Sequence, residues 1–273
     1  MSEQPASLTL VGAGKMGGAM LDGWLKLGLD PRRVICVDPH LSEGPRATLA
    51  AKGVSIVAST ADLTAPAVLV LAIKPQMLDE AAASLAPLIG ERTLMLSVLA
   101  GKTIADLQAR CKGARAIVRA MPNTPAAVGR GITAAVASAG VSTAQKATAD
   151  ALLKAIGRVE WITDEALIDG VTAVSGSGPA YVFYLVEALA EAGARVGLPP
   201  DLSMRLARAT VEGAGELMFR SDLPPATLRQ NVTSPGGTTA AALSVLMNDA
   251  TGLAPLMTEA VAAAKRRAGE LSG

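Results

Sequence analysis

The first half of the chain alternates short apolar runs, rich in β-branched residues, with longer amphipathic stretches. Six runs predict strands, at residues 7–11, 34–37, 54–57, 67–73, 93–98 and 116–119, and two more predict edge strands at 132–137 and 158–162. A helical period over 19–27 ends at Gly28. Because the strands are far enough apart for crossovers, the pattern predicts a parallel sheet covered on both faces.

Strand-like runs disappear after about Asp164, and helical periods replace them at 179–196, 201–219, 239–248 and 253–271. Some of these helices are apolar on more than one side, as over 181–186. Since a helix that is apolar all round is buried, we expect contact with a second subunit. The chain therefore predicts an α/β domain at 1–163 and an all-α domain at 164–273.

Composition removes several classes of function. The 273 residues carry 25 basic and 24 acidic side chains and only 2% aromatics, so nothing attracts a polyanion or stacks bases. One histidine, His40, and two cysteines cannot by themselves form a His/Cys metal site, and no metal is expected. A Ser-His-Asp triad would have to use His40, and no Gly-x-Ser-x-Gly elbow is present.

The same sequence indicates a cytoplasmic protein. The longest apolar stretch near the middle covers only residues 65–73, whereas a helix needs about 20 residues to span a bilayer. The segment MSEQPAS lacks the features of a signal peptide. Two isolated cysteines, Cys36 and Cys111, are typical of a reducing compartment.

A dinucleotide fingerprint follows the first predicted strand, at Gly12-Ala13-Gly14-Lys15-Met16-Gly17. Its glycines allow a tight turn, a close approach of the pyrophosphate, and close packing of the helix on the strand. Asp38, about twenty residues further on, is placed to bind the ribose hydroxyls and favours NAD over NADP. The first domain is thus predicted to be Rossmann-like. The alternatives are a turn for chain reversal only and, for Asp38, a turn former before Pro39.

Three later loops follow strands, where ligands of open α/β sheets bind. Ala72-Ile73-Lys74-Pro75 follows the fourth strand and Ala100-Gly101 the fifth, and Asn123 lies between two prolines after the sixth. Lys74 could face the cofactor or a substrate anion, and the amide of Asn123 could bind a carboxamide. A solvated lysine and a structural turn are the alternatives.

The helical half contains two polar, glycine-rich breaks. Ser175-Gly176-Ser177-Gly178-Pro179 predicts a turn between helices, and Thr233-Ser234-Pro235-Gly236-Gly237-Thr238-Thr239 precedes a helix. Free amides at the second break could hold a small carboxylate. The alternative for both is a capped turn between helices. A reductase site of the Ser/Tyr/Lys type is excluded, because it needs a lysine four residues after the tyrosine, and neither Tyr181 nor Tyr184 has one.

These motifs resemble the pyrroline-5-carboxylate reductase family over essentially the whole chain. The resemblance rests on the fingerprint, on Leu71-Ala72-Ile73-Lys74-Pro75-Gln76, and on Arg119-Ala120-Met121-Pro122-Asn123-Thr124-Pro125. It is strongest at residues 172–182 and 232–239. It implies a Rossmann-like domain, a helical domain that interlocks in a homodimer, further assembly into rings such as a decamer, and reduction of 1-pyrroline-5-carboxylate to L-proline by NADPH or NADH.

The resemblance also assigns roles to residues. Those implied for the cofactor are Gly12, Gly14, Lys15, Met16, Gly17, Asp38, Ala72, Ile73, Lys74, Pro75, Ala100, Gly101 and Asn123. Those implied for the substrate are Ser175, Gly176, Ser234, Gly236, Gly237, Thr238 and Thr239, with Thr238 beside the ring nitrogen as the catalytic residue. The family generally favours NADPH and often has Ser, Asn or Arg at this position, where this chain has Asp38. The alternatives are a reductase of another cyclic imino acid, an enzyme that acts on a 3-hydroxy acid, and a dinucleotide-binding sensor without turnover.

Overall fold

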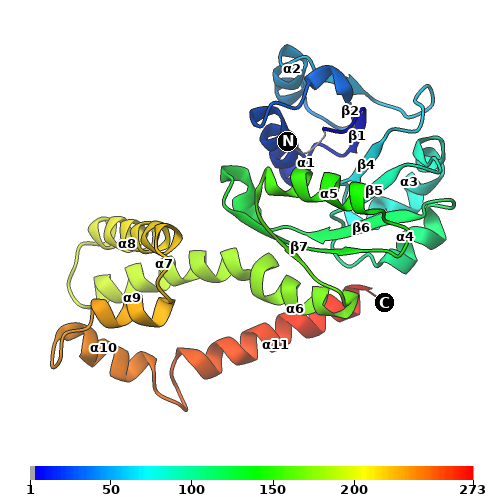
Figure 1. Cartoon of the computed structure of the whole chain (residues 1–273). Coiled ribbons are helices and arrows are strands. Elements are labelled where there is room, and N and C mark those ends of the chain that lie inside the picture. Colours follow the sequence, from blue (N-terminus) through cyan, green and yellow to red (C-terminus); the bar gives the residue numbers. More distant parts are fainter. Residues whose placement is uncertain (1–3, 273) are drawn as a thin grey trace. The chain divides into compact units, whose positions relative to one another are not determined.

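The computed structural model describes residues 4–272. Its centre is a sheet of eight strands in the order β3-β2-β1-β4-β5-β6-β7-β8 (Figure 1). The strands are β1 (Leu8–Val11), β2 (Val34–Val37), β3 (Ser55–Val57), β4 (Val68–Leu71), β5 (Leu94–Ser97), β6 (Ala116–Met121), β7 (Gly131–Ala137) and β8 (Gly157–Trp161). Among the described residues, neighbouring strands pair in parallel except β6 and β7. The predicted mostly parallel sheet is confirmed.

The sheet is buried on both faces, which explains why its strands are continuous apolar runs. Along β4, Val68 and Val70 pack in the core with helices α1 (Lys15–Lys26) and α5 (Thr143–Lys154). Leu69 and Leu71 pack in the core with α3 (Leu78–Leu85) and α4 (Ile104–Arg110). The helix pairs therefore cover opposite faces of the sheet (Figure 1). Trp24 of α1 ties the first pair together by donating from Nε1 to the carbonyl of Leu152, at 2.9 Å.

The helices are α1 (Lys15–Lys26), α2 (Glu43–Ala51), α3 (Leu78–Leu85), α4 (Ile104–Arg110), α5 (Thr143–Lys154), α6 (Ile168–Val171), α7 (Gly178–Arg195), α8 (Pro200–Arg220), α9 (Pro225–Asn231), α10 (Thr238–Leu246) and α11 (Leu253–Ser272). The short helix α9 was not predicted. The turn predicted before α7 is wrong: Thr172–Gly176 forms a π-helical turn, and Ser177 stands at the N-cap position of α7 without a side-chain capping hydrogen bond. The chain is thus almost continuously helical there.

The chain forms two compact units. The first ends at Gly176 and also contains the chain from Lys265 onward, and the second runs from Ser177 to Ala264. The predicted division falls earlier, between residues 163 and 164. The segment after residue 164 groups with the sheet because Ile168 is buried with Ala134 and Val136 of β7.

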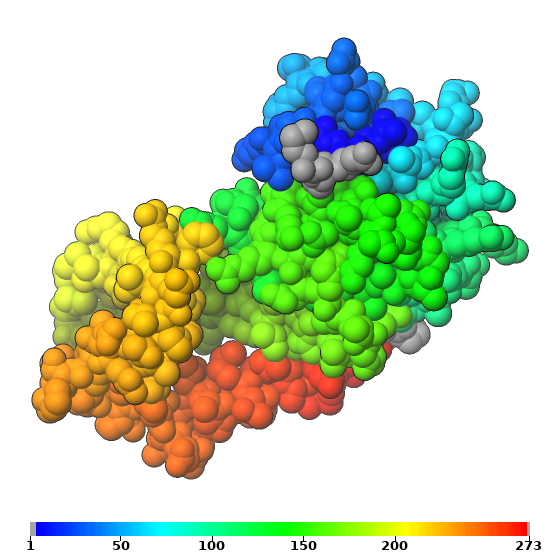
Figure 2. All heavy atoms as spheres, viewed as in Figure 1, coloured from blue at the N-terminus to red at the C-terminus, as the bar shows by residue number. Residues whose placement is uncertain are grey.

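Helices α7 and α8 are the closest-packed pair of the second unit. Ser203 of α8 is buried and donates to the carbonyl of Ala190 in α7, at 2.6 Å. Other faces of this unit stay apolar and exposed, and the side chain of Tyr184 on α7 is 70% accessible. Figure 2 shows this unit in colours from yellow-green to orange-red. No helix within residues 4–272 is both long and apolar enough to cross a membrane.

Candidate active site

The loop between β1 and α1 needs glycine at two positions for packing. Gly12 has a φ of +93°, and a Cβ there would lie 2.8 Å from the carbonyl oxygen of Ala72. A Cβ on buried Gly17 would lie 2.0 Å from the carbonyl oxygen of Gly12. Both glycines are therefore required by the loop itself, and Met16 between them is half-buried against the core of α1 and α5.

Gly14 differs, because the loop does not need it. Its φ is −64°, which any residue adopts, and a Cβ there would meet nothing within 4 Å. Gly14 is the N-cap of α1, whose first turn has no side-chain cap and no acidic residue. A helix start with free amides attracts phosphate, and a missing side chain lets the phosphate reach the backbone. The loop therefore fits a pyrophosphate.

Asp38 stands directly after β2 and is tied to this loop. Its Oδ2 accepts a hydrogen bond from the amide of Ala13 at 2.9 Å, and its Oδ1 accepts one from the amide of His40 at 2.9 Å. Arg46 donates from Nη2 to the Asp38 carbonyl at 3.3 Å. The carboxylate keeps lone pairs for a ribose hydroxyl, while Arg46 brings positive charge to the same corner.

Six of the predicted cofactor residues line one cavity of about 540 Å³: Gly12, Gly14, Asp38, Ala72, Ile73 and Lys74. They follow three different strands of the sheet. Lys15 lines a second hollow of about 560 Å³, which shares Gly14 and Asp38 with the first. The structure thus brings these cofactor residues together at the carboxyl ends of the strands, where a dinucleotide binds such folds.

Three further cofactor candidates lie elsewhere. Pro75, Ala100 and Gly101 line a separate cavity of about 280 Å³, together with Lys102 and Asp169. Gly101 has a φ of +71°, and a Cβ there would lie 2.9 Å from the carbonyl oxygen of Leu271 at the end of α11. The loop after β5 is therefore fixed against the end of that helix.

Asn123 uses its amide within the chain. Its Nδ2 donates to the carbonyl of Ser175 at 3.2 Å, and its Oδ1 accepts from the amide of Ile132 at 3.0 Å. This side chain is buried and holds the π-helical turn beside the turn after β6. The hydroxyl of Ser175 donates to the carbonyl of Val171, and Gly176 lies against the methyl group of Met121.

The remaining substrate candidates form one exposed loop at the start of α10, in the second unit: Ser234, Gly236, Gly237, Thr238 and Thr239. Gly236 has a φ of +70°, and the amide of Gly237 donates to the carbonyl of Ser234 at 3.0 Å. No side chain caps α10. Its first amides are therefore available to an anion such as a carboxylate.

The comparisons with known proteins agree over nearly the whole chain. The family model "Pyrroline-5-carboxylate reductase dimerisation" matches residues 165–271, and "NADP oxidoreductase coenzyme F420-dependent" matches residues 7–101. The pyrroline-5-carboxylate reductase of Pseudomonas aeruginosa is 39% identical over 267 residues, covering 97% of this chain and 96% of that protein. The chain belongs to the pyrroline-5-carboxylate reductase family. The predicted resemblance is thereby confirmed.

Other members of the pyrroline-5-carboxylate reductase family support the same assignment. The Synechocystis enzyme is 42% identical over 270 residues, with 97% of each chain covered. A structure of the Coxiella burnetii enzyme superposes with a TM-score of 0.90 at 34% identity, covering 99% of this chain and 100% of that one. The Plasmodium falciparum enzyme with NADP bound has a TM-score of 0.81 at 27% identity, covering 98% of each chain.

Sequence reasoning missed one wall of the cavity of about 540 Å³ that the Gly12, Asp38 and Lys74 loops line. Residues 58–60, which follow β3, line it together with Met77 and Glu80 of the α3 region. The rule that ligands bind at the carboxyl ends of strands would have identified the loop after β3, as it did the others.

The Cys36 thiol is not activated as a nucleophile. Burial raises the pKa of the Cys36 thiol to about 11, and the nearby charge of Asp38 adds to the effect. The thiol is therefore protonated at neutral pH. Within residues 4–272, no group of three His, Cys, Asp or Glu side chains could hold a metal ion.

Proposed function

We propose that this chain is a pyrroline-5-carboxylate reductase, an oxidoreductase that uses NADPH or NADH to reduce the C=N bond of 1-pyrroline-5-carboxylate to L-proline. The reaction is the last step of proline biosynthesis. The observation that carries the proposal is Gly14, whose open space and free helix amides serve a pyrophosphate rather than the fold. The family relationship over 97% of the chain supports the choice of substrate.

When bound, the reduced nicotinamide supplies the hydride that the C=N carbon takes up, while the nitrogen gains a proton. The chain's own residues bind the imine substrate and orient it towards the nicotinamide. The amides of Gly236 and of the first turn of α10, next to Gly237, hold the carboxylate. Thr238 donates or accepts a hydrogen bond at the ring nitrogen. Ser234 and Thr239 are proposed as further contacts of this ligand in the second unit, and Ser175 and Gly176 as substrate contacts in the first. Fixing the imine in one orientation is the main contribution of such residues to the rate.

The proposed cofactor residues follow successive strands, and each group would contact a different part of the dinucleotide. Gly12, Gly14, Lys15 and Met16 surround the pyrophosphate, with Gly17 packing behind them. Asp38 binds the ribose. Ala72, Ile73, Lys74 and Pro75, then Ala100, Gly101 and Asn123, continue towards the nicotinamide end. The order of the strands supports this path, since β2, β1, β4 and β5 are consecutive in the sheet.

We also propose that residues 164–273 form the dimerisation and substrate-binding domain of a homodimer. The exposed apolar side chains of α7, such as Phe183 and Tyr184, support a partner surface there. The dimerisation family model spans the same region. Light scattering should give twice the chain mass of 27.6 kDa, or a multiple of the dimer if dimers close into a ring such as a decamer. A cytoplasmic location is proposed from the two unpaired cysteines.

The test of the activity is a spectrophotometric assay of NADPH or NADH oxidation with 1-pyrroline-5-carboxylate. Piperideine-2-carboxylate and a 3-hydroxy acid (the latter with the oxidised cofactors) serve as competing substrates. We expect the highest kcat/KM with 1-pyrroline-5-carboxylate. Faster turnover of another substrate would contradict the proposed specificity, and binding of the dinucleotide without any turnover would indicate a sensor.

A further inference from the structure

Glu165 connects two elements that lie far apart in the sequence. Its Oε1 accepts a hydrogen bond from the amide of Ile104 at 2.8 Å and another from Nη1 of Arg119 at 2.8 Å. The side chain of Arg119, on β6, is only 5% exposed, whereas that of Glu165 is 29% exposed. A buried guanidinium needs its counter-charge, so Arg119 holds the Glu165 carboxylate in place.

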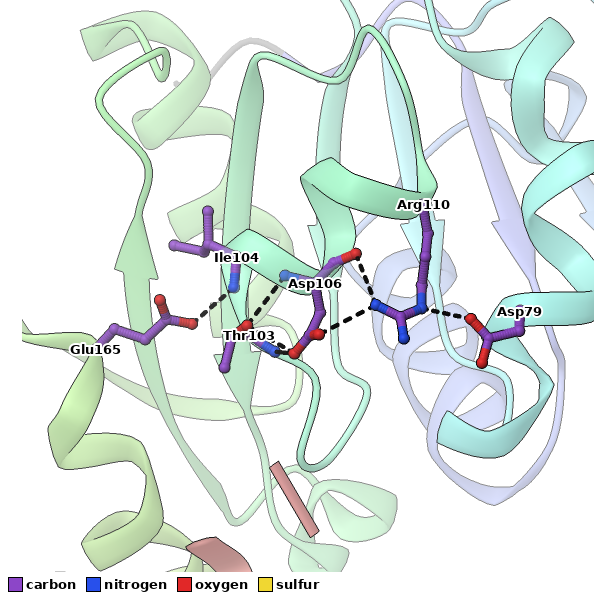
Figure 3. A network of polar contacts seen from close by, with 6 residues as sticks. All are labelled: Asp79, Thr103, Ile104, Asp106, Arg110 and Glu165. Atoms are coloured by element: carbon purple, nitrogen blue, oxygen red, sulfur yellow. Dashed lines mark hydrogen bonds and ion pairs between the residues drawn. The ribbon is translucent and has the colours of Figure 1, made fainter. Parts of the chain in front are cut away.

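Ile104 is the first residue of α4, which directly follows the cofactor loop at Ala100-Gly101. A reciprocal pair of hydrogen bonds between Thr103 and Asp106 fixes this helix start (Figure 3). A carboxylate next to the first amides of a helix is also favoured by the helix dipole. The bond from Glu165 to Ile104 therefore determines where the cofactor loop ends.

The segment that begins at Glu165 leads through α6 to the π-helical turn with Ser175 and Gly176. Its far end is held by Asn123, through the hydrogen bond to the Ser175 carbonyl. Both anchors, Arg119 and Asn123, belong to β6 or the turn after it. The segment is thus attached at its two ends to one strand, and Glu165 also attaches it to α4.

We propose that Glu165, oriented by Arg119, is a positioning residue for hydride transfer. It holds the cofactor loop at Ala100-Gly101 in register with the substrate wall at Ser175-Gly176. This inference rests on the proposed function, because that function assigns the two walls to the cofactor and the substrate. The same helix has a second anchor on its other side, where Arg110 pairs with Asp79 of α3 (Figure 3). That outer anchor provides a matched control.

Three variants test the role of Glu165. Glu165→Gln leaves Arg119 without its charge partner, and the double variant Arg119→Met/Glu165→Met removes both charges and the bond to Ile104. Asp79→Asn breaks only the outer anchor. For each variant we would measure thermal unfolding, kcat and KM, the Kd of NADPH by fluorescence, and hydrogen exchange of residues 98–104.

We expect Glu165→Gln to lose stability and to lower kcat by at least about tenfold. The double variant should regain stability, because no unpaired buried charge remains. It should nevertheless keep the low kcat, a weaker Kd for NADPH and faster exchange over 98–104. Asp79→Asn should match the wild type in kcat and in Kd.

Recovery of kcat together with stability in the double variant would overturn the proposal, since the pair would then be merely structural. Equal loss of kcat in Asp79→Asn would overturn it as well. If the wild type oxidises no cofactor with 1-pyrroline-5-carboxylate, the proposed function fails instead. The Kd and exchange measurements still decide the role of Glu165 in that case, because they need no turnover.

Discussion

The three glycines of the fingerprint loop are needed for different reasons. Gly12 and Gly17 are required because a Cβ at either position would collide with backbone. Of these three glycines, only Gly14 has room for a Cβ and a φ that any residue adopts. We therefore attribute the glycine at this position to ligand binding. Asp38 lines the same cavity and accepts hydrogen bonds from two loop amides, and we propose that it also binds the ribose.

Replacement of Gly14 separates binding from folding. Gly14→Ala should leave the unfolding temperature unchanged or slightly raised, because alanine fits the backbone and reduces the entropy of the unfolded chain. The Kd of NADPH should weaken at least about tenfold, or 1.4 kcal/mol, because the methyl group occupies the approach of the pyrophosphate. Calorimetry and fluorescence titration measure both. Gly44→Ala, in equally open space on α2, is the control, and an unchanged Kd for Gly14→Ala would contradict the assignment.

Asp38 should influence the choice between cofactors. Asp38→Asn removes a negative charge that repels a 2′-phosphate, and Arg46 remains nearby. The ratio of kcat/KM for NADPH to that for NADH should rise about tenfold. Because both cofactors are measured on one variant, a loss of stability does not alter the ratio. An unchanged ratio would restrict Asp38 to holding Ala13 and His40.

Thr238 should affect the rate and not the fold. Among the described residues its hydroxyl has no hydrogen-bond partner, so Thr238→Ala removes no internal contact. We expect turnover to fall at least about tenfold, equivalent to about 1.4 kcal/mol of barrier. Thr238→Ser, which keeps the hydroxyl, should retain most of the turnover. A normal rate for Thr238→Ala at saturating substrate would remove this residue from the mechanism.

At the scale of elements, α4 shows how a short helix is stabilised at a site. Thr103 and Asp106 form a capping box, and Arg110, one turn later, forms an ion pair with Asp106. Burial alone would raise the pKa of Asp106. The hydrogen bonds from Thr103 and the charge of Arg110 outweigh burial, so the pKa lies below its usual value. The ionised form is therefore the one that stabilises the helix start.

The stability that Asp106 supplies should depend on pH. Because its pKa is lowered in the folded state, the contribution is complete above the unfolded value of 3.8 and is lost as the pH falls through the folded pKa. Asp106→Asn should reduce the free energy of unfolding by about 1 kcal/mol at neutral pH. Urea unfolding should show that the difference in free energy of unfolding between wild type and variant becomes smaller at acid pH. A difference that is constant across pH would contradict the role of the charge.

Strands and fingerprint could be predicted because their signals are local. Short β-branched runs such as 34–37 and 68–71 form strands wherever both faces are covered. The π-helical turn could not be predicted, because Ser-Gly-Ser-Gly favours a turn, whereas its contacts with Asn123 and Met121 are tertiary. The pair of Glu165 and Arg119 was also invisible, because 46 residues separate its members.

At the scale of the whole molecule, the chain passes between its two compact units twice, after Gly176 and again before Lys265. Cofactor candidates belong to the first unit, and the loop from Ser234 to Thr239 belongs to the second. The exposed apolar side chains of α7 fit a second copy of the chain. We therefore propose that cofactor binding belongs to the first unit and substrate binding mainly to the second.

The central claim is that this chain delivers a hydride from its dinucleotide to the C=N carbon of 1-pyrroline-5-carboxylate. The most direct measurement uses NADPH carrying deuterium at the transferable position and analyses the product by mass spectrometry and NMR. The account predicts L-proline with one deuterium on the ring carbon that was double-bonded to nitrogen. Proline without deuterium at that carbon, or no proline while the dinucleotide is bound, would contradict it.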